Sequence, residues 1–353
     1  MRLLIGGSTS KFYKLTEFGN ALQTIGHEYK LVEDIEYSKG FPSKNTSDWF
    51  GTKEKFKKLV SDFSPDAILI DRNSYFGLDA IKSKIPLFIL LRGNYWLEKE
   101  ISKKTINSGF TNRTAIWLRN RNIEKIFRGA TMIFTISGYL EKVVKQHYPD
   151  IPTSKFFEGM NTTEWSNVKG MELKHPCVGL LQSANIWPKT KEILTMKKVL
   201  EHMPDTTFYW AGDGVYRDKI LLELNKYKNF KSIGKLEYPQ EVKEFLSAVD
   251  VYALPSGLDT MPLTLMEAQL LKRPVVATNV GGIPECLEEN KTGFLIEEGD
   301  YKGWIDKLSI LINDKTKAKK MGCEGREFVK NTFNWATTAK NFLSKTEPHI
   351  KNN

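Results

Sequence analysis

The sequence predicts two α/β domains, each a Rossmann-like, doubly wound parallel sheet covered by helices. Two observations support this fold class. Apolar strand patterns alternate with amphipathic helix patterns along almost all of the 353 residues, as they do in βαβ units. The alternation stops over residues 149–176, where Pro, Thr, Asn and Gly are typical of a linker, and then restarts. At roughly 150 residues per domain, the length also fits two domains.

The N-terminal half contains short apolar runs that end in glycine or polar residues, as buried strands do. The strands predicted there are 2–7, 28–34, 67–71, 86–91 and 131–137. The helices predicted between and after them include 14–26, 52–63 and 138–148. Ser137 is expected to cap the last of these helices.

The C-terminal half repeats this pattern after the linker. Its predicted strands include 177–181, 207–212, 250–255 and 274–278. Its predicted helices include 189–202, 218–227, 242–249 and 263–271. We therefore expect an N-terminal domain over residues 1–172 and a C-terminal domain over 173–334. The last helix, about 335–353, is compatible with either domain, including packing back on the first.

Composition is ordinary for a soluble globular protein, with 41% hydrophobic and 27% charged residues. The longest clean apolar run, residues 85–91, is far shorter than the ~20 residues that span a bilayer. The N-terminal MRLLIGGSTS is too short for a signal peptide, so a cytoplasmic protein is expected. Cys177, Cys286 and Cys323 are scattered and odd in number, which predicts free thiols without disulfides or zinc spacing.

The net charge of +10 favours an anionic partner. The densest basic stretch is 111–130, in which five Lys or Arg residues face one acid, Glu124, with apolar residues at roughly helical spacing. This segment is either a solvated helix that packs through its apolar stripe or a helix that contacts the inner face of an anionic membrane peripherally. No nucleic-acid-binding signature accompanies the charge, so nucleic acid is not expected as a partner.

Doubly wound sheets bind ligands at the carboxyl ends of strands, where the strand order reverses. In two such domains facing each other, the cleft between them is the expected site. The N-terminal candidates follow predicted strands: Gly6, Gly7, Asp71, Arg92 and Asn94. Glycines here would let backbone amides approach a phosphate or sugar, although a plain tight turn explains them equally well. The spacing is not GxGxxG, so no dinucleotide fingerprint is present.

Three candidates in the C-terminal half follow strands in the same way. Gly212 and Gly214 open a helix after 207–212, which suits a nucleotide or a structural turn. Lys189 and Lys191 lie near a helix start, where they would neutralise a diphosphate or remain solvated. The glycine pair 281–282 forms either a loop with exposed amides or a helix-entry turn.

The stretch SGLDTMPLTLMEAQ, residues 256–269, places Asp259 eight positions before Glu267. If Pro262 lies in the first helical turn, the nearby backbone amides form a positive helix end beside both carboxylates. Carboxylates accept hydrogen bonds from a diol, and amides at a helix start bind phosphate. The alternative is a pair of solvated surface acids.

Around this motif the chain resembles the retaining glycosyltransferases of family 4, also called glycosyl transferases group 1, which have the two-domain GT-B fold. Asp259-x7-Glu267 matches the family's E-x7-E motif, and the similarity runs over residues 254–300. Upstream, AGDG, IGKL and SAVDVYALPS extend it, and weaker similarities cover 26–28, 135–144 and 158–165.

The resemblance implies that the C-terminal domain binds a nucleotide-sugar donor and the N-terminal domain an acceptor. It implies that Glu267 binds the ribose, that Asp259 lies near the transferred sugar, and that Lys189 holds the diphosphate. The other donor-side residues that it implies are Met261, Pro262, Leu263, Gly212 and Gly214. No metal and no cofactor are expected, because the five histidines are dispersed and none pairs with an acid at ligand spacing.

Three positions depart from the family pattern. Asp259 is one methylene shorter than the usual glutamate, which bears on sugar contacts. Leu180 or Leu181 stands where an arginine is usual, so phosphate binding relies more on Lys189. Arg92 replaces the histidine that often ends the fourth N-terminal strand. A retaining transfer needs no dedicated base, since the leaving diphosphate can accept the acceptor proton.

The expected function is a hexosyltransferase-type enzyme of glycan or glycolipid biosynthesis. It would move a sugar from a nucleotide-sugar donor to a saccharide or lipid-linked acceptor. Two alternatives stay open: a nucleotide-sugar epimerase or hydrolase of similar shape, and a non-catalytic protein that binds a sugar nucleotide or a membrane surface.

Overall fold

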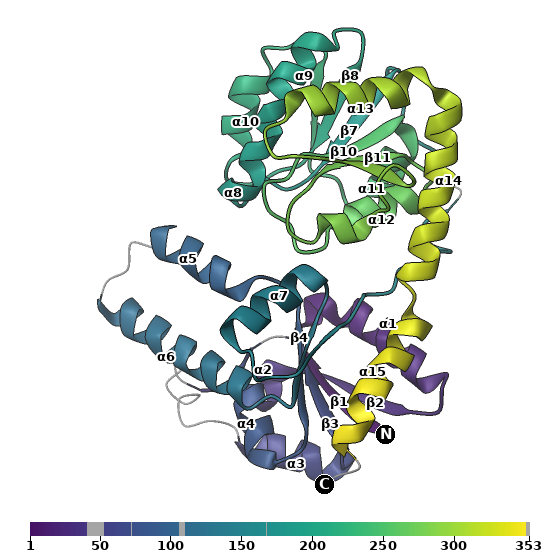
Figure 1. The fold of residues 1–353 in the computed structure, drawn as a ribbon. Helices are drawn as coiled ribbons and strands as arrows, with labels where there is room; N and C mark the ends of the chain where they lie inside the picture. The colour runs from purple at the N-terminus through teal and green to yellow at the C-terminus, as the bar shows by residue number, and fades with distance from the viewer. Residues whose placement is uncertain (41–52, 72, 106–109, 167, 351–353) are drawn as a thin grey trace. The chain divides into compact units, whose positions relative to one another are not determined.

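The structure is a computed structural model that describes residues 1–40, 53–71, 73–105, 110–166 and 168–350. The chain divides into two compact units. The first runs from Met1 to Gly159 and also includes the chain from Phe333 onward, whereas the second runs from Met160 to Thr332. Each unit is an α/β layer structure with one sheet (Figure 1).

The N-terminal unit contains a parallel six-stranded sheet in the order β2-β1-β3-β4-β5-β6. Its strands are β1 (Arg2–Gly7), β2 (Glu28–Glu33), β3 (Ala67–Ile70), β4 (Leu87–Leu91), β5 (Met132–Thr135) and β6 (Thr153–Lys155). Its helices before the linker are α1 (Phe12–Gln23), α2 (Asp34–Tyr37), α3 (Lys53–Phe63), α4 (Tyr75–Ser83), α5 (Tyr95–Thr105), α6 (Phe110–Arg128) and α7 (Gly138–His147). The central strands are buried on both faces, which explains their continuous apolar sequences.

The C-terminal unit repeats this architecture, with a parallel sheet in the order β12-β11-β10-β7-β8-β9. Its strands are β7 (Cys177–Leu181), β8 (Thr207–Ala211), β9 (Phe230–Gly234), β10 (Val251–Leu254), β11 (Val275–Thr278) and β12 (Gly293–Ile296). Its helices are α8 (Trp187–Thr190), α9 (Met196–His202), α10 (Arg217–Leu224), α11 (Gln240–Ala248), α12 (Leu263–Leu270), α13 (Tyr301–Asn313) and α14 (Lys315–Thr332). The predicted fold class is therefore confirmed in both units.

The last helix, α15 (Trp335–Ile350), packs in the N-terminal unit beside α1. Phe342 of α15 lies 5.2 Å from Phe18 of α1 and 4.9 Å from Phe134, measured between ring centroids. The Trp335 indole N–H donates to the Glu17 carboxylate at 3.0 Å. This aromatic packing places the C-terminal helix with the first unit, one of the two options that the sequence left open.

The structure differs from the sequence expectation at the domain boundary, which lies after Gly159 and not near residue 172. Trp165 explains the difference, because it is only 2% exposed within the second unit and its carbonyl accepts from Arg326 of α14. The predicted helix 189–202 is also divided into α8, a 3-10 turn (Lys191–Thr195) and α9. Short β6 lies inside the predicted linker.

The order of strands reverses at one place in each sheet. In the N-terminal unit the reversal lies between β1 and β3, and in the C-terminal unit it lies between β7 and β10. Such reversals open a crevice at the carboxyl ends of the two strands. The segments that follow these four strands are therefore where ligand-binding residues are expected.

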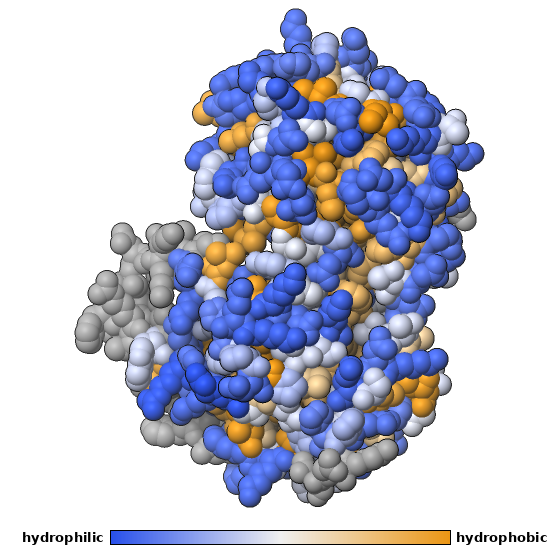
Figure 2. Space-filling view, viewed as in Figure 1, coloured by the Kyte–Doolittle hydropathy of each residue, from blue (hydrophilic) through white to orange (hydrophobic). Residues whose placement is uncertain are grey.

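On the face shown in Figure 2, hydrophilic side chains cover most of each unit, and apolar side chains are exposed in smaller patches between them. Among the described residues, no helix combines the length and the apolar content needed to cross a bilayer.

Candidate functional site

The candidate site in the C-terminal unit lies at the reversal between β7 and β10. Lys189 comes from α8, after β7, and Asp259 comes from the loop after β10. The Lys189 Nζ donates to Asp259 Oδ2 at 2.6 Å, and both side chains are largely buried, 24% and 10% exposed. The structure thus brings together two residues that are 70 positions apart in the chain.

Close backbone contacts hold this pair in place. The Gly257 N–H donates to the Lys189 carbonyl at 3.0 Å, and a Cβ at Gly257 would lie 2.3 Å from the Pro188 carbonyl oxygen. On the other side, the Gly282 N–H donates to the Asp259 carbonyl at 3.0 Å. Gly281 has a φ of +57°, and a Cβ there would come within 2.0 Å of the same oxygen. The glycine pair 281–282 therefore supports the Asp259 loop.

Glu267 lies in the middle of α12 and is only 2% exposed. The Tyr238 hydroxyl donates to its Oε1 at 3.2 Å. Pro262 is the N-cap of α12, with φ −74° and ψ 112°, so the helix begins at Leu263 and not at the proline. Met261 and Pro262 are buried beside this helix start, and Leu263 is half-buried. Glu267 is therefore an interior carboxylate, which argues against the reading as solvated surface acids.

Tyr252 of β10 is fully buried, and the charges of both Glu267 and Asp259 act on its phenol. Burial raises the pKa of its phenol, and the carboxylates of Glu267 and Asp259 raise that pKa further, although the Thr264 hydroxyl opposes the shift. The hydroxyl donates to the Leu181 carbonyl at 3.0 Å and lies 2.7 Å from the Thr264 Oγ1. Tyr252 was not predicted as part of the site, because it lies within an apolar strand.

Gly212 and Gly214 pack against the loop that leads from β7 to Lys189. A Cβ at Gly212 would lie 2.2 Å from the Gln182 carbonyl oxygen, and Gly214 has a φ of +139°. The Ala184 N–H donates to the Asp213 carbonyl at 2.8 Å. Both glycines are required by this close contact, and their role in donor binding stays a prediction. Lys191 points to Glu298, 3.2 Å away, and does not join Lys189.

The strand-end candidates of the N-terminal unit form a separate group. The Arg92 guanidinium pairs with the carboxylates of both Asp71 and Glu158. All three side chains are mostly buried, at 16%, 3% and 8% exposed. Glu158 was not predicted, since nothing in its local sequence marks it as a partner of Arg92.

The remaining N-terminal candidates have structural roles in the described residues. A Cβ at Gly7 would lie 3.4 Å from that of Asp71 and would clash with Leu15, and a Cβ at Gly6 would clash with Phe76. Asn94 accepts from the Leu97 N–H at 3.1 Å at the start of α5 and donates to the Tyr139 hydroxyl at 3.0 Å.

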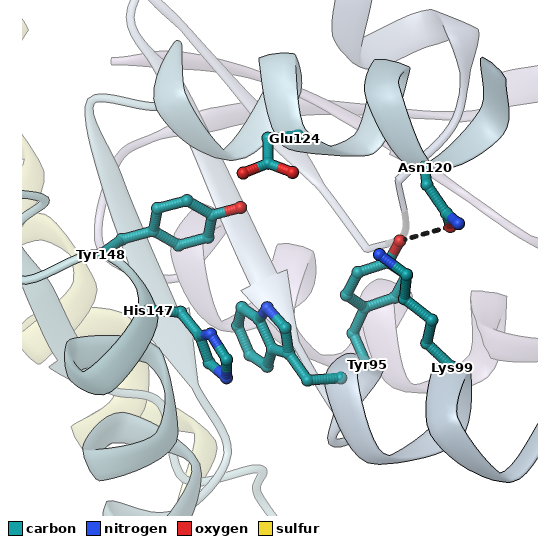
Figure 3. Close-up of a pocket in the computed structure, with 7 residues that line it drawn as sticks. Tyr95, Lys99, Asn120, Glu124, His147 and Tyr148 are labelled. Carbon is teal, nitrogen blue, oxygen red and sulfur yellow. Dashed lines mark hydrogen bonds between the residues drawn. The ribbon is translucent and has the colours of Figure 1, made fainter. Parts of the chain in front are cut away.

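A pocket of about 170 Å³ lies between α5, α6 and the end of α7 in the same unit (Figure 3). Trp96 stacks on His147 with 4.2 Å between ring centroids and on Phe127 with 5.5 Å. Burial, together with the Glu124 carboxylate, raises the pKa of Tyr148 to about 12. The lining residues are Tyr95, Trp96, Lys99, Asn120, Glu124, His147 and Tyr148. The lining combines aromatic rings with one basic and one acidic side chain, Lys99 and Glu124.

The basic segment 111–130 falls mostly on α6, and the side chains of 111–116 lie outside the described residues. From Trp117 onward, Ile123, Ile126 and Phe127 are buried in the N-terminal core. Trp117 is 59% exposed, with the Arg121 guanidinium 5.5 Å from its ring centroid. The described part of the segment therefore packs through an apolar stripe and also presents one exposed aromatic residue.

Two α/β units, each with a parallel six-stranded sheet, are the architecture of the GT-B class of fold. Residues 183–314 match the model of the family of glycosyl transferases group 1. The family resemblance expected from the motifs is thereby confirmed over this region.

Curated relatives match part of the chain at higher identity than the solved structures do. D-inositol 3-phosphate glycosyltransferase of Corynebacterium efficiens is 38% identical over 106 residues, which are 30% of this chain and 25% of that protein. Sulfoquinovosyl transferase SQD2 of Arabidopsis thaliana is 31% identical over 157 residues, 42% of this chain and 30% of that protein. The alignments thus span only about a quarter to a third of these relatives.

Solved structures extend the likeness to the whole fold. Sucrose-phosphate synthase from Thermosynechococcus elongatus superposes with a TM-score of 0.73 at 14% identity, covering 100% of both chains. HepE of Anabaena, in complex with UDP, superposes with a TM-score of 0.71 at 14% identity and covers 99% of this chain and 100% of its own. At this identity the match establishes the GT-B fold of both units.

Proposed function

We propose that this protein is a retaining, hexosyltransferase-type glycosyltransferase that takes a sugar from a nucleotide-sugar donor. The observation that carries the proposal is the Lys189–Asp259 pair at the β7/β10 reversal, next to the helix that carries buried Glu267. The family assignment of residues 183–314 supports it. Acceptors would be saccharides or lipid-linked saccharides, in glycan or glycolipid biosynthesis.

In the proposed complex, Glu267 accepts hydrogen bonds from the ribose hydroxyls. A carboxylate suits this role because it is acceptor-only when ionised and can accept from two hydroxyls of a diol. Lys189 neutralises the diphosphate as a point charge, and the amides that follow Met261 approach the same group. Asp259 lies on the sugar side. Solved complexes of HepE with UDP and with UDP-glucose make a uridine nucleotide the first donor to test.

The proposed transfer breaks the bond between the anomeric carbon and the diphosphate oxygen and forms the bond to the acceptor oxygen on the same face. The acceptor proton passes to the leaving diphosphate. Lys189 stabilises the charge that develops on this leaving group, which is the largest kind of contribution an enzyme makes to such a step. With Lys189 in that role, the scheme requires neither a metal nor another cofactor.

The acceptor would bind the N-terminal unit, through the Arg92 cluster or the aromatic pocket. Trp117 and the basic residues of α6 support a peripheral contact with anionic membrane on the cytoplasmic side, which would bring a lipid-linked acceptor close. This contact predicts binding to anionic vesicles that weakens with salt. Trp117→Ala should reduce it, and absence of binding at low salt would remove this part of the proposal.

The donor proposal is tested by screening UDP-, GDP- and ADP-sugars for thermal stabilisation, because a ligand that binds the folded state raises its apparent stability. Glu267→Ala combined with Lys189→Ala should abolish the shift. Lys191→Ala is the matched control, since Lys191 lies two residues away but pairs with Glu298. Stabilisation that survives the double substitution would contradict the donor site, and nucleotide release on adding acceptors separates transfer from binding.

A further inference from the structure

Three potential metal ligands meet at the amino ends of β7 and β10, whereas the candidate donor site lies beyond the carboxyl ends of these strands. His175 and Cys177 lie at the start of β7, and Asp250 directly precedes β10. Their ligand atoms all lie within 4.8 Å of one another. Among the described residues this is the one group of three or more His, Cys, Asp or Glu side chains close enough to share an ion. This group of three ligands was not predicted, because Asp250 is 75 positions from His175 in the sequence.

We propose that His175, Cys177 and Asp250 form a binding site for a zinc-class divalent cation. A thiolate, an imidazole and a carboxylate are the ligand types that zinc takes in proteins, whereas calcium and magnesium prefer oxygen alone. The thiolate also favours zinc over the harder divalent ions. The site is independent of the proposed transfer reaction.

The distances between the ligand atoms are close to those of a tetrahedral zinc site. With zinc–sulfur and zinc–nitrogen bonds of about 2.3 and 2.05 Å, a tetrahedral site places sulfur and nitrogen about 3.5 Å apart. The Cys177 Sγ lies 3.5 Å from the His175 Nδ1. The His175 Nδ1 and the Asp250 Oδ2 are 2.8 Å apart and would have to separate by about 0.5 Å to reach the corresponding tetrahedral spacing.

The backbone preorganises two of the three ligands. The Asp250 N–H donates to the Cys177 carbonyl at 3.2 Å, and the Cys177 N–H donates to the Asp250 Oδ2 at 2.8 Å. Cys177 is fully buried, whereas the His175 side chain is 48% exposed and the Asp250 side chain 24%. The ion would therefore bind at the surface end of the two strands, with the fourth position open to water as in other three-ligand sites.

Two consequences follow from this location. The strands are four and five residues long, so the site lies about 15 Å from their carboxyl ends, which lead to the segments that carry Lys189 and Asp259. The ion would join the starts of β7 and β10 and stabilise the unit without entering the reaction. Lys315 Nζ lies 3.9 Å from Asp250 Oδ1, but its side chain is 77% exposed and is free to turn away.

Cobalt binding to the untagged full-length protein tests the proposal, with a reductant that contains no thiol. One equivalent of Co²⁺ should produce a thiolate-to-cobalt charge-transfer band, and Zn²⁺ should remove it by displacement. Cys177→Ser should abolish the band, whereas Cys323→Ser, at the partly exposed cysteine, should retain it. No band in the unmodified protein, or a band that follows Cys323, would overturn the proposal.

Thermal unfolding provides a second readout if Cys177→Ser does not fold. Free Zn²⁺ at a hundredfold excess over its Kd should raise the Tm of the unmodified protein by about 5 °C. His175→Gln changes an exposed side chain and should lose most of this shift. His202→Gln is the matched control on α9, and it should keep the full shift. An equal Zn²⁺ shift in all three proteins would exclude the site.

Discussion

The side chains of Lys189 and Asp259 form an ion pair of 2.6 Å at the strand reversal of the C-terminal sheet. In the proposed complex, the same ammonium group holds the donor diphosphate. A diphosphate must therefore compete with Asp259 for Lys189, or share it. Asp259 therefore differs from the family's first glutamate in more than length. Its carboxylate partly neutralises the ammonium group that Lys189 presents to the donor diphosphate.

Asp259→Asn should tighten the binding of a nucleoside diphosphate alone by about twofold to fivefold. The substitution removes a competitor whose pairing with Lys189 contributes about 0.5–1 kcal/mol if it resembles other partly exposed ion pairs. Sugar transfer should fall in the same variant, since the sugar-side carboxylate is lost. Titration calorimetry with UDP checks the first effect. If Asp259→Asn weakens UDP binding as Lys189→Ala does, the pair positions Lys189 and does not compete with the ligand.

Glu267→Gln should weaken donor binding by about tenfold to a hundredfold, the size of hydrogen bonds to a charged group. The amide keeps the shape of the side chain but replaces one acceptor oxygen with a donor. The unmodified protein should also bind a 2′-deoxy nucleotide less tightly than its ribose counterpart, and the variant should lose this discrimination. Equilibrium binding of both nucleotides measures the effect. Retained discrimination in Glu267→Gln would show that another group binds the ribose.

Tyr238→Phe is the matched control for that experiment. It removes the hydroxyl that donates to Glu267 at 3.2 Å but keeps the carboxylate. Its effect on binding should be smaller than that of Glu267→Gln.

The sequence predicted the fold class and the family motif, but not the contacts that build the site. Asp259 and Glu267 were found because their spacing lies within one continuous segment. Tyr252 and Gly257 contribute through contacts with neighbouring strands and loops, which depend on the order of strands in the sheet. Glu158 could not be assigned to Arg92 for the same reason. Short β6 has no apolar run, so no local signal distinguished it from the linker.

Arg92→Met should destabilise the protein by about 3–5 kcal/mol, because it leaves the buried carboxylates of Asp71 and Glu158 without their shared cation. The triple variant with Asp71→Asn and Glu158→Gln should recover part of this loss, since no buried charge then remains uncompensated. Urea unfolding measures both. An equal loss in the single and triple variants would mean that packing of the arginine, and not its charge, stabilises the cluster.

Glu192 provides a prediction on pH. Burial raises the pKa of its carboxyl, although the Gly299 N–H and the Thr195 hydroxyl favour the charged form. The folded state therefore binds the Glu192 proton more tightly than the unfolded state does. Its stabilising contribution is fully present below the ordinary carboxyl pKa and is lost as the pH rises through the raised pKa of the folded state.

Glu192→Gln removes this titration, so the stability of the unmodified protein relative to the variant should fall as the pH rises above the ordinary carboxyl pKa of about 4.3. Urea unfolding of both proteins across a series of pH values measures the difference. Thr195→Val removes a hydroxyl that donates to the Glu192 carboxylate at 3.0 Å. The charged form of Glu192 is then less stable, so the loss of protein stability should move to higher pH. A difference that stays constant with pH, or rises with it, would mean that the two hydrogen-bonding groups outweigh burial and that Glu192 is charged in the folded protein throughout.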